Sequence, residues 1–149
     1  MTEGESASGT RPPDRVEQVI EVSAGLVFRH GLLLITQRRP GDHLGGMWEF
    51  PGGKRQMGES DEDCLKRELA EELGIEVEIL GLLETVTHEY PERTVRLKFF
   101  QCRWHRHEPR PIECHAFIWA GAAQLADYSF PAADAQILKK LLATPTLWA

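Results

Sequence analysis

A length of 149 residues, with 42% hydrophobic and 27% charged residues, is typical of one globular domain that buries a hydrophobic core. The net charge of -6 at pH 7 argues against a nucleic-acid polymer as the main partner, because a phosphate backbone binds basic surfaces. The chain shows no signal-peptide pattern and no apolar run near the ~18–20 residues of a membrane span, so a cytoplasmic protein without membrane association is expected.

Residues 1–17 are small, polar and proline-containing, so a disordered leader is expected before a single domain at 18–149. The first part of that domain alternates runs rich in Val, Ile and Phe with glycine-containing turns, which predicts strands joined by short connections. His30-Gly31 is a two-residue turn, so the first two strands are expected to form a hairpin. A glycine-rich connection then leads to a short third strand. The predicted strands of this part lie at 19–29, 32–38 and 48–50.

The most informative stretch begins at the double glycine after Pro51, where a loop at 52–59 and a helix at 61–73 are expected. Ser60 is a favourable N-cap, and three acidic residues follow it in the first turn, where negative charge complements the helix dipole. Gly74 can adopt the left-handed conformation that ends a helix.

This helix has two distinct faces when it is plotted at 100° per residue. Leu65, Leu69 and Leu73 form one stripe, which a hydrophobic core would cover. Glu68, Glu71 and Glu72 lie on a neighbouring face, with Glu59 in the preceding loop. Such a face is often only a solvated acidic surface. Clustered carboxylates beside a glycine-rich turn also suit Mg²⁺ or Mn²⁺, because hard cations prefer oxygen ligands.

The second part of the chain predicts a long hairpin, a further strand and a last helix. Apolar residues alternate on both sides of a turn at 90–93, and Gly81 is expected to kink the first strand. After a loop at 105–115 come a short strand, a short helix and an amphipathic helix. The expected elements are 76–88, 94–104, 116–120, 122–126 and 133–142. This order indicates an α/β protein with a mixed sheet and helices packed against it.

Nine positions within 23 residues follow one spacing, G-x5-E-x7-R-E-U-x-E-E-x-G-U, where U is a bulky aliphatic residue. They are Gly53, Glu59, Arg67, Glu68, Leu69, Glu71, Glu72, Gly74 and Ile75. This spacing is the Nudix signature, so the chain resembles the Nudix hydrolases. The stretches ITQRR, WEFPGGK, YPERTVRLKFF and FPAAD further resemble the MutT-type nucleoside triphosphate pyrophosphohydrolases, from about residue 20 to 142.

The resemblance implies an α/β/α sandwich and an enzyme that hydrolyses nucleoside triphosphates to monophosphate and pyrophosphate. It implies Mg²⁺ as the cofactor, with Mn²⁺ as an alternative. The metal ligands would be Glu68, Glu71, Glu72 and the backbone carbonyl of Gly52, with Arg67 holding the glutamates in place. Glu113 corresponds to a further metal-binding or base-assisting glutamate, although a loop acid at such a position can also be plain surface charge.

The same resemblance implies that Arg38 contacts the phosphates and that Tyr90, Arg93 and Leu44 line the substrate pocket. Asp134 occupies a position where oxidised-guanine enzymes of the family have asparagine. An ionised aspartate only accepts hydrogen bonds, so it suits the amine of cytosine or the N–H groups of guanine better than the guanine O6. Alternatively, Asp134 only caps the last helix.

A small-molecule nucleotide is therefore the expected partner, and no obligate protein partner is inferred. The leading expectation is hydrolysis of 8-oxo-dGTP in nucleotide-pool sanitation. The alternatives are a pyrimidine-preferring CTP or dCTP pyrophosphohydrolase and a non-catalytic Nudix ligand sensor. Three cysteines, an odd number with no CxxC pair, agree with reduced thiols in the cytoplasm.

Overall fold

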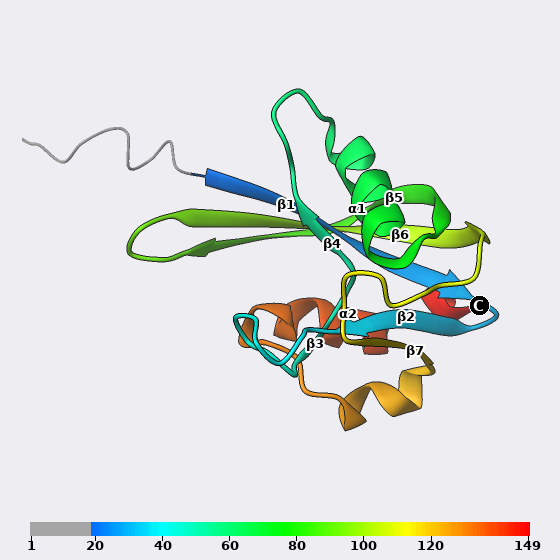
Figure 1. Cartoon of the computed structure of the whole chain (residues 1–149). Coiled ribbons are helices and arrows are strands. Elements are labelled where there is room, and N and C mark those ends of the chain that lie inside the picture. Colours follow the sequence, from blue (N-terminus) through cyan, green and yellow to red (C-terminus); the bar gives the residue numbers. More distant parts are fainter. Residues whose placement is uncertain (1–18) are drawn as a thin grey trace, which may run out of the picture.

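The computed structural model describes residues 19–149, and the leader expected at 1–17 lies outside them (Figure 1). The first two strands form the predicted hairpin, in which Phe28 pairs with Leu33. The predicted helix at 61–73 is confirmed with the same bounds. The elements of this part are β1 (Val19–Arg29), β2 (Leu32–Gln37), β3 (Trp48–Glu49), β4 (Gly52–Lys54) and α1 (Asp61–Leu73).

The later elements also follow the predicted order. The long hairpin, the next strand and the last helix are all present, and short 3₁₀ helices precede and follow the last helix. The elements are β5 (Glu76–Glu89), β6 (Thr94–Arg106), β7 (Ala116–Ala120), a 3₁₀ helix at Ala122–Asp127, a second at Ala132–Asp134, α2 (Ala135–Ala143) and a third 3₁₀ helix at Pro145–Trp148.

Within residues 19–149, seven strands form one mixed sheet with the central order β3-β2-β1-β6-β5. The β1–β6 pair is parallel and the other pairs are antiparallel. The predicted loop at 52–59 is wrong at its start, because 52–54 form β4 and pair with β1. A Cβ atom on Gly52 would overlap the Ser23 carbonyl oxygen, so a residue without a side chain lets the two strands approach.

Hydrophobic side chains form one cluster on each face of the sheet, because successive strand residues point to opposite sides. In β1, Leu26 joins one cluster and Val27 joins the other. The leucine stripe of α1 closes the cluster of Val27, whereas Ile137 and Leu141 of α2 close the opposite one. Figure 1 shows the two helices on opposite sides of the strands. The fold is the α/β/α sandwich expected from the sequence.

The ends of α1 match the signals in the sequence. The Ser60 hydroxyl accepts a hydrogen bond of 3.0 Å from the backbone N–H of Asp63, which confirms the N-cap. Gly74 ends the helix in the left-handed conformation with φ 70°. A well-defined start and end fix which residues of α1 face the core and which face the neighbouring loops.

The β5–β6 hairpin extends beyond the rest of the sandwich (Figure 1). Its register shifts between Ile79 and Gly81 and again between Leu82 and Glu84, so β5 carries two irregularities around the glycine that the sequence marks as a kink. β5 lies at one end of the strand order. No helix within the described residues is long and apolar enough to cross a membrane.

Candidate active site

Arg67 lies at the centre of the acidic face of α1. Its Nε and Nη2 atoms donate to the two carboxylate oxygens of Glu59, at 2.5 and 3.0 Å. Its Nη1 atom lies 3.1 Å from an oxygen of Glu68 and 3.1 Å from an oxygen of Glu71. The hydrogen bonds from Arg67 lower the pKa of Glu59 to about 2. One guanidinium therefore neutralises part of a cluster that would otherwise repel itself.

Glu72 and Glu68 face inward from the same helix. Glu72 is partly exposed as a residue, but its Oε1 atom is buried and has no hydrogen-bond partner among residues 19–149. Burial, together with the charges of Glu49 and Glu68, raises the pKa of Glu72 to about 8. Burial also raises the pKa of Glu68, whose carboxylate would overlap a side chain on Gly53. The second glycine of the pair thus leaves room for a carboxylate.

The loop between β6 and β7 brings Glu113 to this cluster. The backbone N–H groups of Ile112 and Glu113 both donate to the Glu72 carbonyl oxygen, at 3.0 and 3.1 Å. The Glu113 charge contributes to the raised pKa of both Glu68 and Glu72, as expected for a neighbouring carboxylate. Glu113 therefore lies near Glu68 and Glu72, two of the acids with which the sequence groups it.

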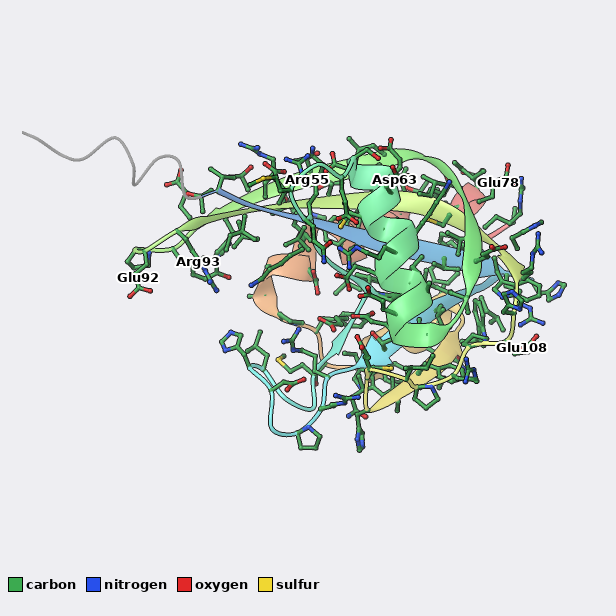
Figure 2. The ribbon with its side chains drawn as sticks, turned by 45° about the horizontal axis from the view of Figure 1, so that its top comes forward. Arg55, Asp63, Glu78, Glu92, Arg93 and Glu108 are labelled. Atoms are coloured by element: carbon green, nitrogen blue, oxygen red, sulfur yellow. The ribbon has the colours of Figure 1, made fainter. Side chains whose placement is uncertain are left out.

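A cavity of about 350 Å³ is lined by Glu72 and Gly52, by residues of β1 and β6, and by residues just before α2. Among the residues expected to bind substrate, Arg38, Tyr90 and Asp134 line it, as does Leu44. Arg93 does not belong to its lining. Figure 2 shows Arg93 beside Glu92 at the tip of the β5–β6 hairpin, away from α1.

Asp134 lines the same cavity as Glu49 and Glu72. It is buried, with 6% of its surface exposed, and its side chain makes no capping hydrogen bond to α2. Burial and the charge of Glu49 raise its pKa to about 7. The absence of a capping bond weighs against the interpretation of Asp134 as only a helix cap.

Glu49 is the residue of the cavity that the sequence did not single out. It lines the cavity and accepts a hydrogen bond of 2.9 Å from Nη1 of Arg38, while Nε of Arg38 donates to the His43 carbonyl. Burial raises the pKa of Glu49 despite the nearby arginine. The only signal in the sequence was an acid within the otherwise hydrophobic strand WEF, directly before the double glycine. Phe50, Leu97 and Phe99 form apolar walls beside it.

The residues fit a divalent metal in their chemistry. Within 19–149, no three His, Cys, Asp or Glu side chains already converge as a set of ligands, and Arg67 lies between Glu68 and Glu71 instead. The Oε1 atom of Glu72 is buried and has no partner among the described residues, which costs free energy. A bound cation would remove this cost, because carboxylate oxygens are preferred ligands of divalent metals.

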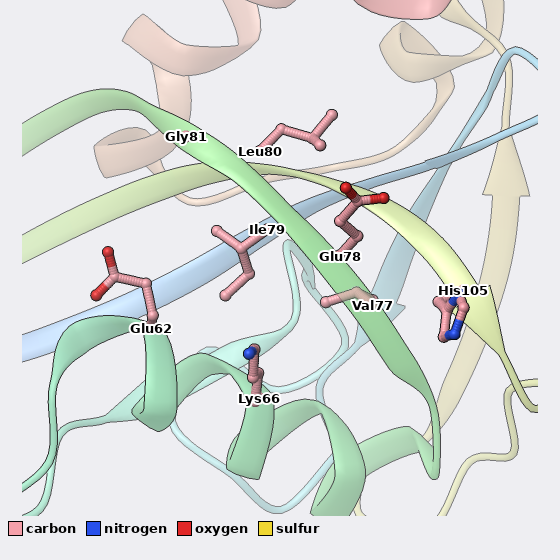
Figure 3. Close-up of a pocket in the computed structure, with 8 residues that line it drawn as sticks. All are labelled: Glu62, Lys66, Val77, Glu78, Ile79, Leu80, Gly81 and His105. Atoms are coloured by element: carbon pink, nitrogen blue, oxygen red, sulfur yellow. The ribbon is translucent and has the colours of Figure 1, made fainter.

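A second hollow, about 580 Å³, lies between α1 and β5 (Figure 3). Glu62 and Lys66 of α1 line it together with Val77, Ile79 and His105. On the helix, Glu62 and Lys66 border the leucine stripe on the side away from Glu68, Glu71 and Glu72. This hollow is therefore separate from the carboxylate cluster and from the cavity that contains Asp134.

This chain is similar to known proteins of one family. Residues 23–140 match the model of the NUDIX domain. An 8-oxo-dGTP diphosphatase of Haemophilus influenzae is 35% identical over 127 residues, which cover 85% of this chain and 93% of the relative. A CTP pyrophosphohydrolase of Escherichia coli is 31% identical over 126 residues, with 85% and 93% covered. The chain therefore belongs to the Nudix family.

Solved structures agree with the fold. The solution structure of the E. coli ORF135 protein has a TM-score of 0.75 and 31% identity, covering 85% of this chain and 90% of that one. The MutT protein of Methanosarcina mazei Go1 has a TM-score of 0.73, covering 82% and 91%, at 23% identity, and so supports the fold alone. Within the Nudix family, this chain is a MutT-type hydrolase, an enzyme rather than a non-catalytic sensor.

Proposed function

We propose that the enzyme hydrolyses 8-oxo-dGTP to the monophosphate and pyrophosphate with Mg²⁺, and that it acts on the nucleotide pool of the cytoplasm. The observation that carries this proposal is one cavity whose lining combines three kinds of surface. Glu72 and Gly52 belong to the acidic site, Asp134 is a buried polar group, and Phe50, Leu97 and Phe99 are apolar walls. A nucleotide has matching parts, namely charged phosphates and a flat base with polar edges.

The names of similar enzymes support this substrate class. The H. influenzae relative is an 8-oxo-dGTP diphosphatase, and so is a Proteus vulgaris enzyme that is 45% identical over 82 residues, covering 54% of this chain and 73% of the relative. A nucleoside triphosphate also agrees with the net charge of -6, since local arginines and a metal can neutralise a small anion where the whole surface is acidic.

In this mechanism, the groups that would hold the metal are Glu68, Glu71, Glu72, Glu113 and the Gly52 carbonyl. A bound divalent cation would polarise the phosphoryl oxygens and make a water molecule more acidic. Arg67 orients the glutamates through its hydrogen bonds and balances part of their charge. Arg38 binds the phosphates with charge-assisted hydrogen bonds, for which its guanidinium would leave Glu49. One water molecule is consumed for each bond broken between phosphates.

Asp134 supplies base recognition in this proposal. A carboxyl group with a pKa of about 7 is protonated in a large fraction of molecules at neutral pH. Its hydroxyl can then donate to the guanine O6, while its carbonyl accepts the N7–H that only the oxidised base carries. An ionised aspartate could not donate to the guanine O6, which makes the sequence alone a poor match to 8-oxoguanine. The raised pKa of Asp134 removes this objection, because the protonated form has a donor.

A second candidate is a CTP or dCTP pyrophosphohydrolase. The presence of Asp134 favours it, because the ionised carboxylate accepts a hydrogen bond from the exocyclic amine of cytosine. The similarity to the CTP pyrophosphohydrolase of E. coli supports the same substrate. Ionised and protonated Asp134 thus favour different bases.

The decisive experiment measures pyrophosphate release from 8-oxo-dGTP, dGTP, CTP, dCTP and ADP-ribose with Mg²⁺. The proposal expects kcat/KM for 8-oxo-dGTP to exceed that for each other nucleotide at pH 7. A higher kcat/KM for CTP or dCTP would establish the second candidate instead. Repeating the panel with Mn²⁺ tests whether the metal changes the order of substrates.

A further inference from the structure

We infer that Arg39 is a positioning residue, which holds Glu113 at the carboxylate cluster through the backbone of its loop. The inference rests on the metal-binding role of Glu113 in the proposed function. It concerns a residue outside the Nudix signature, at the end of β2 and next to Arg38. The contacts that carry it join three parts of the chain: the C-terminus of α1, the loop at 107–115 and the end of β2.

The loop first closes the C-terminus of α1. The last carbonyl groups of a helix have no partner within the helix and need one from outside. The backbone N–H groups of Ile112 and Glu113 both donate to the Glu72 carbonyl, and that of Arg110 donates to the Leu73 carbonyl at 2.9 Å. Glu113 is therefore attached by its own backbone to the residue that bears the buried carboxylate.

The backbone N–H groups of Ile112 and Glu113 share one acceptor oxygen, which leaves the Ile112 carbonyl free to accept a bond from outside the loop. Arg39 adds a contact on the outer side, where its Nη2 atom donates to the Ile112 carbonyl at 3.0 Å. This carbonyl belongs to the peptide unit that also contains the Glu113 N–H group. The guanidinium therefore restrains the peptide plane from which the Glu113 side chain begins.

The chain at the end of β2, from which Arg39 extends, is itself bonded to the loop. The Gln37 carbonyl at the end of β2 accepts a hydrogen bond of 2.9 Å from the backbone N–H of His115, so the same strand also binds the other flank of Glu113. Arg38 and Arg39 are consecutive and contact different partners. Arg38 lines the cavity and bonds to Glu49, whereas Arg39 bonds to the loop. A single strand end thus connects the phosphate side of the site with its fourth carboxylate.

A separate contact at the beginning of the loop provides a matched control. Arg29 binds both carboxylate oxygens of Glu108, at 3.0 and 2.8 Å, and lies 4.0 Å from the centre of the Trp104 ring. This ion pair holds the same loop five residues away from Glu113. Glu108→Gln weakens that contact and should leave the position of Glu113 unchanged.

The test measures Mn²⁺ binding to the full chain without nucleotide, by electron paramagnetic resonance. Arg39→Ala should weaken Mn²⁺ binding about two- to tenfold, the range for the net contribution of one typical intramolecular hydrogen bond. Arg39→Lys should restore most of the affinity, and Glu108→Gln should match the wild type. The Arg39→Ala and Glu113→Gln double variant should bind Mn²⁺ no more weakly than Glu113→Gln alone.

Other outcomes overturn the inference in distinguishable ways. If Glu113→Gln weakens Mn²⁺ binding and Arg39→Ala does not, the metal-binding role of Glu113 stands and the positioning role of Arg39 is wrong. If the losses of Mn²⁺ affinity in the two single variants add up in the double variant, Arg39 does not act through Glu113 and its positioning role is also wrong. If Glu113→Gln leaves Mn²⁺ affinity unchanged, the inference and the role of Glu113 both fail. A rise in KM alone for Arg39→Ala would instead indicate direct contact with the phosphates.

Discussion

Arg67 places one positive charge among carboxylates of α1 and of the loop before it. It contacts Glu59, Glu68 and Glu71, yet Glu72 lies beyond its reach and retains a buried oxygen without a partner. At the scale of single residues, Arg67 thus satisfies Glu59, Glu68 and Glu71, whereas it leaves Glu72 of the same helix without a bond to its buried oxygen. Glu72 is consequently the acid whose replacement has the clearest effect without metal.

Replacing Glu72 with Gln should remove most of the activity and raise the stability of the metal-free protein. The folded pKa of about 8 lies above the ordinary value of 4.5. Between these two values the unfolded chain releases a proton that the folded protein keeps, so stability falls as pH rises from about 4.5 to 8. Glutamine does not titrate, so thermal melts in chelator should show a higher Tm for the variant at pH 8 and a small difference at pH 5.

The control for this measurement is Glu62→Gln. Glu62 is an exposed acid of the same helix, outside the carboxylate cluster. The Glu62→Gln substitution should leave both pyrophosphate release and the pH dependence of Tm unchanged. Activity of Glu72→Gln within about threefold of the wild type would remove Glu72 from the metal site, because loss of a charged ligand should cost far more.

Asp134 should make substrate preference depend on pH. Its pKa of about 7 means that the protonated form, which matches 8-oxoguanine, dominates at pH 6 and the ionised form dominates at pH 8. The ratio of kcat/KM for 8-oxo-dGTP over dCTP should therefore fall as pH rises across this range. In Asp134→Asn the ratio should lose this dependence, and at pH 8 it should exceed the wild-type ratio about five- to a hundredfold.

The measurement is the kcat/KM ratio at pH 6, 7 and 8 for both proteins, so that effects of pH on the metal site cancel between substrates. Equal pH profiles for the wild type and Asp134→Asn would exclude a role for Asp134 in reading the base. Selection of the base would then depend on other residues of the cavity, of which Glu49 is the nearest charged group.

At the scale of elements, α1 could be predicted almost completely, whereas the cavity could not. Ser60, Gly74 and the leucine stripe act within one helix, and local rules describe them well. β4 was missed because two glycines give no strand signal, and their pairing with β1 depends on residues about 30 positions earlier in the chain. Glu49 was missed for the same reason, since only folding brings it to Asp134.

The N-cap of α1 permits a test confined to one element. Ser60→Ala removes the acceptor for the Asp63 N–H group and should reduce the free energy of unfolding by about 1 kcal/mol. Ser60→Asp keeps an acceptor at the cap and should recover most of that loss. Urea denaturation of the three proteins measures the difference, and equal values for Ser60→Ala and the wild type would show that the cap contributes little.

At the scale of the whole molecule, metal binding should stabilise the fold, because the acids of the site come from α1 and from the loop that closes its C-terminus. A ligand that binds only the folded state raises stability by RT ln(1 + [L]/Kd), or about 2.7 kcal/mol at a hundredfold excess over Kd. Tm should therefore rise steadily with Mg²⁺ at pH 7.5. The rise should be much smaller in Glu72→Gln. The control is a buffer without Mg²⁺ in which NaCl supplies the same ionic strength.

The long hairpin has a consequence for the behaviour of the protein at high concentration. β5 ends the sheet with a fourteen-residue edge that carries exposed Leu80 and Leu82, a combination that invites other chains to add a strand. The register shifts around Gly81 interrupt the regular spacing of backbone groups on this edge. Charged side chains also lie along it, since Glu76, Glu78 and Glu84 form ion pairs with Arg106, Arg103 and Lys140. Irregular backbone spacing and charged side chains are both features that disfavour edge-to-edge pairing, so a regular, uncharged β5 should turn the same edge into a template for fibres.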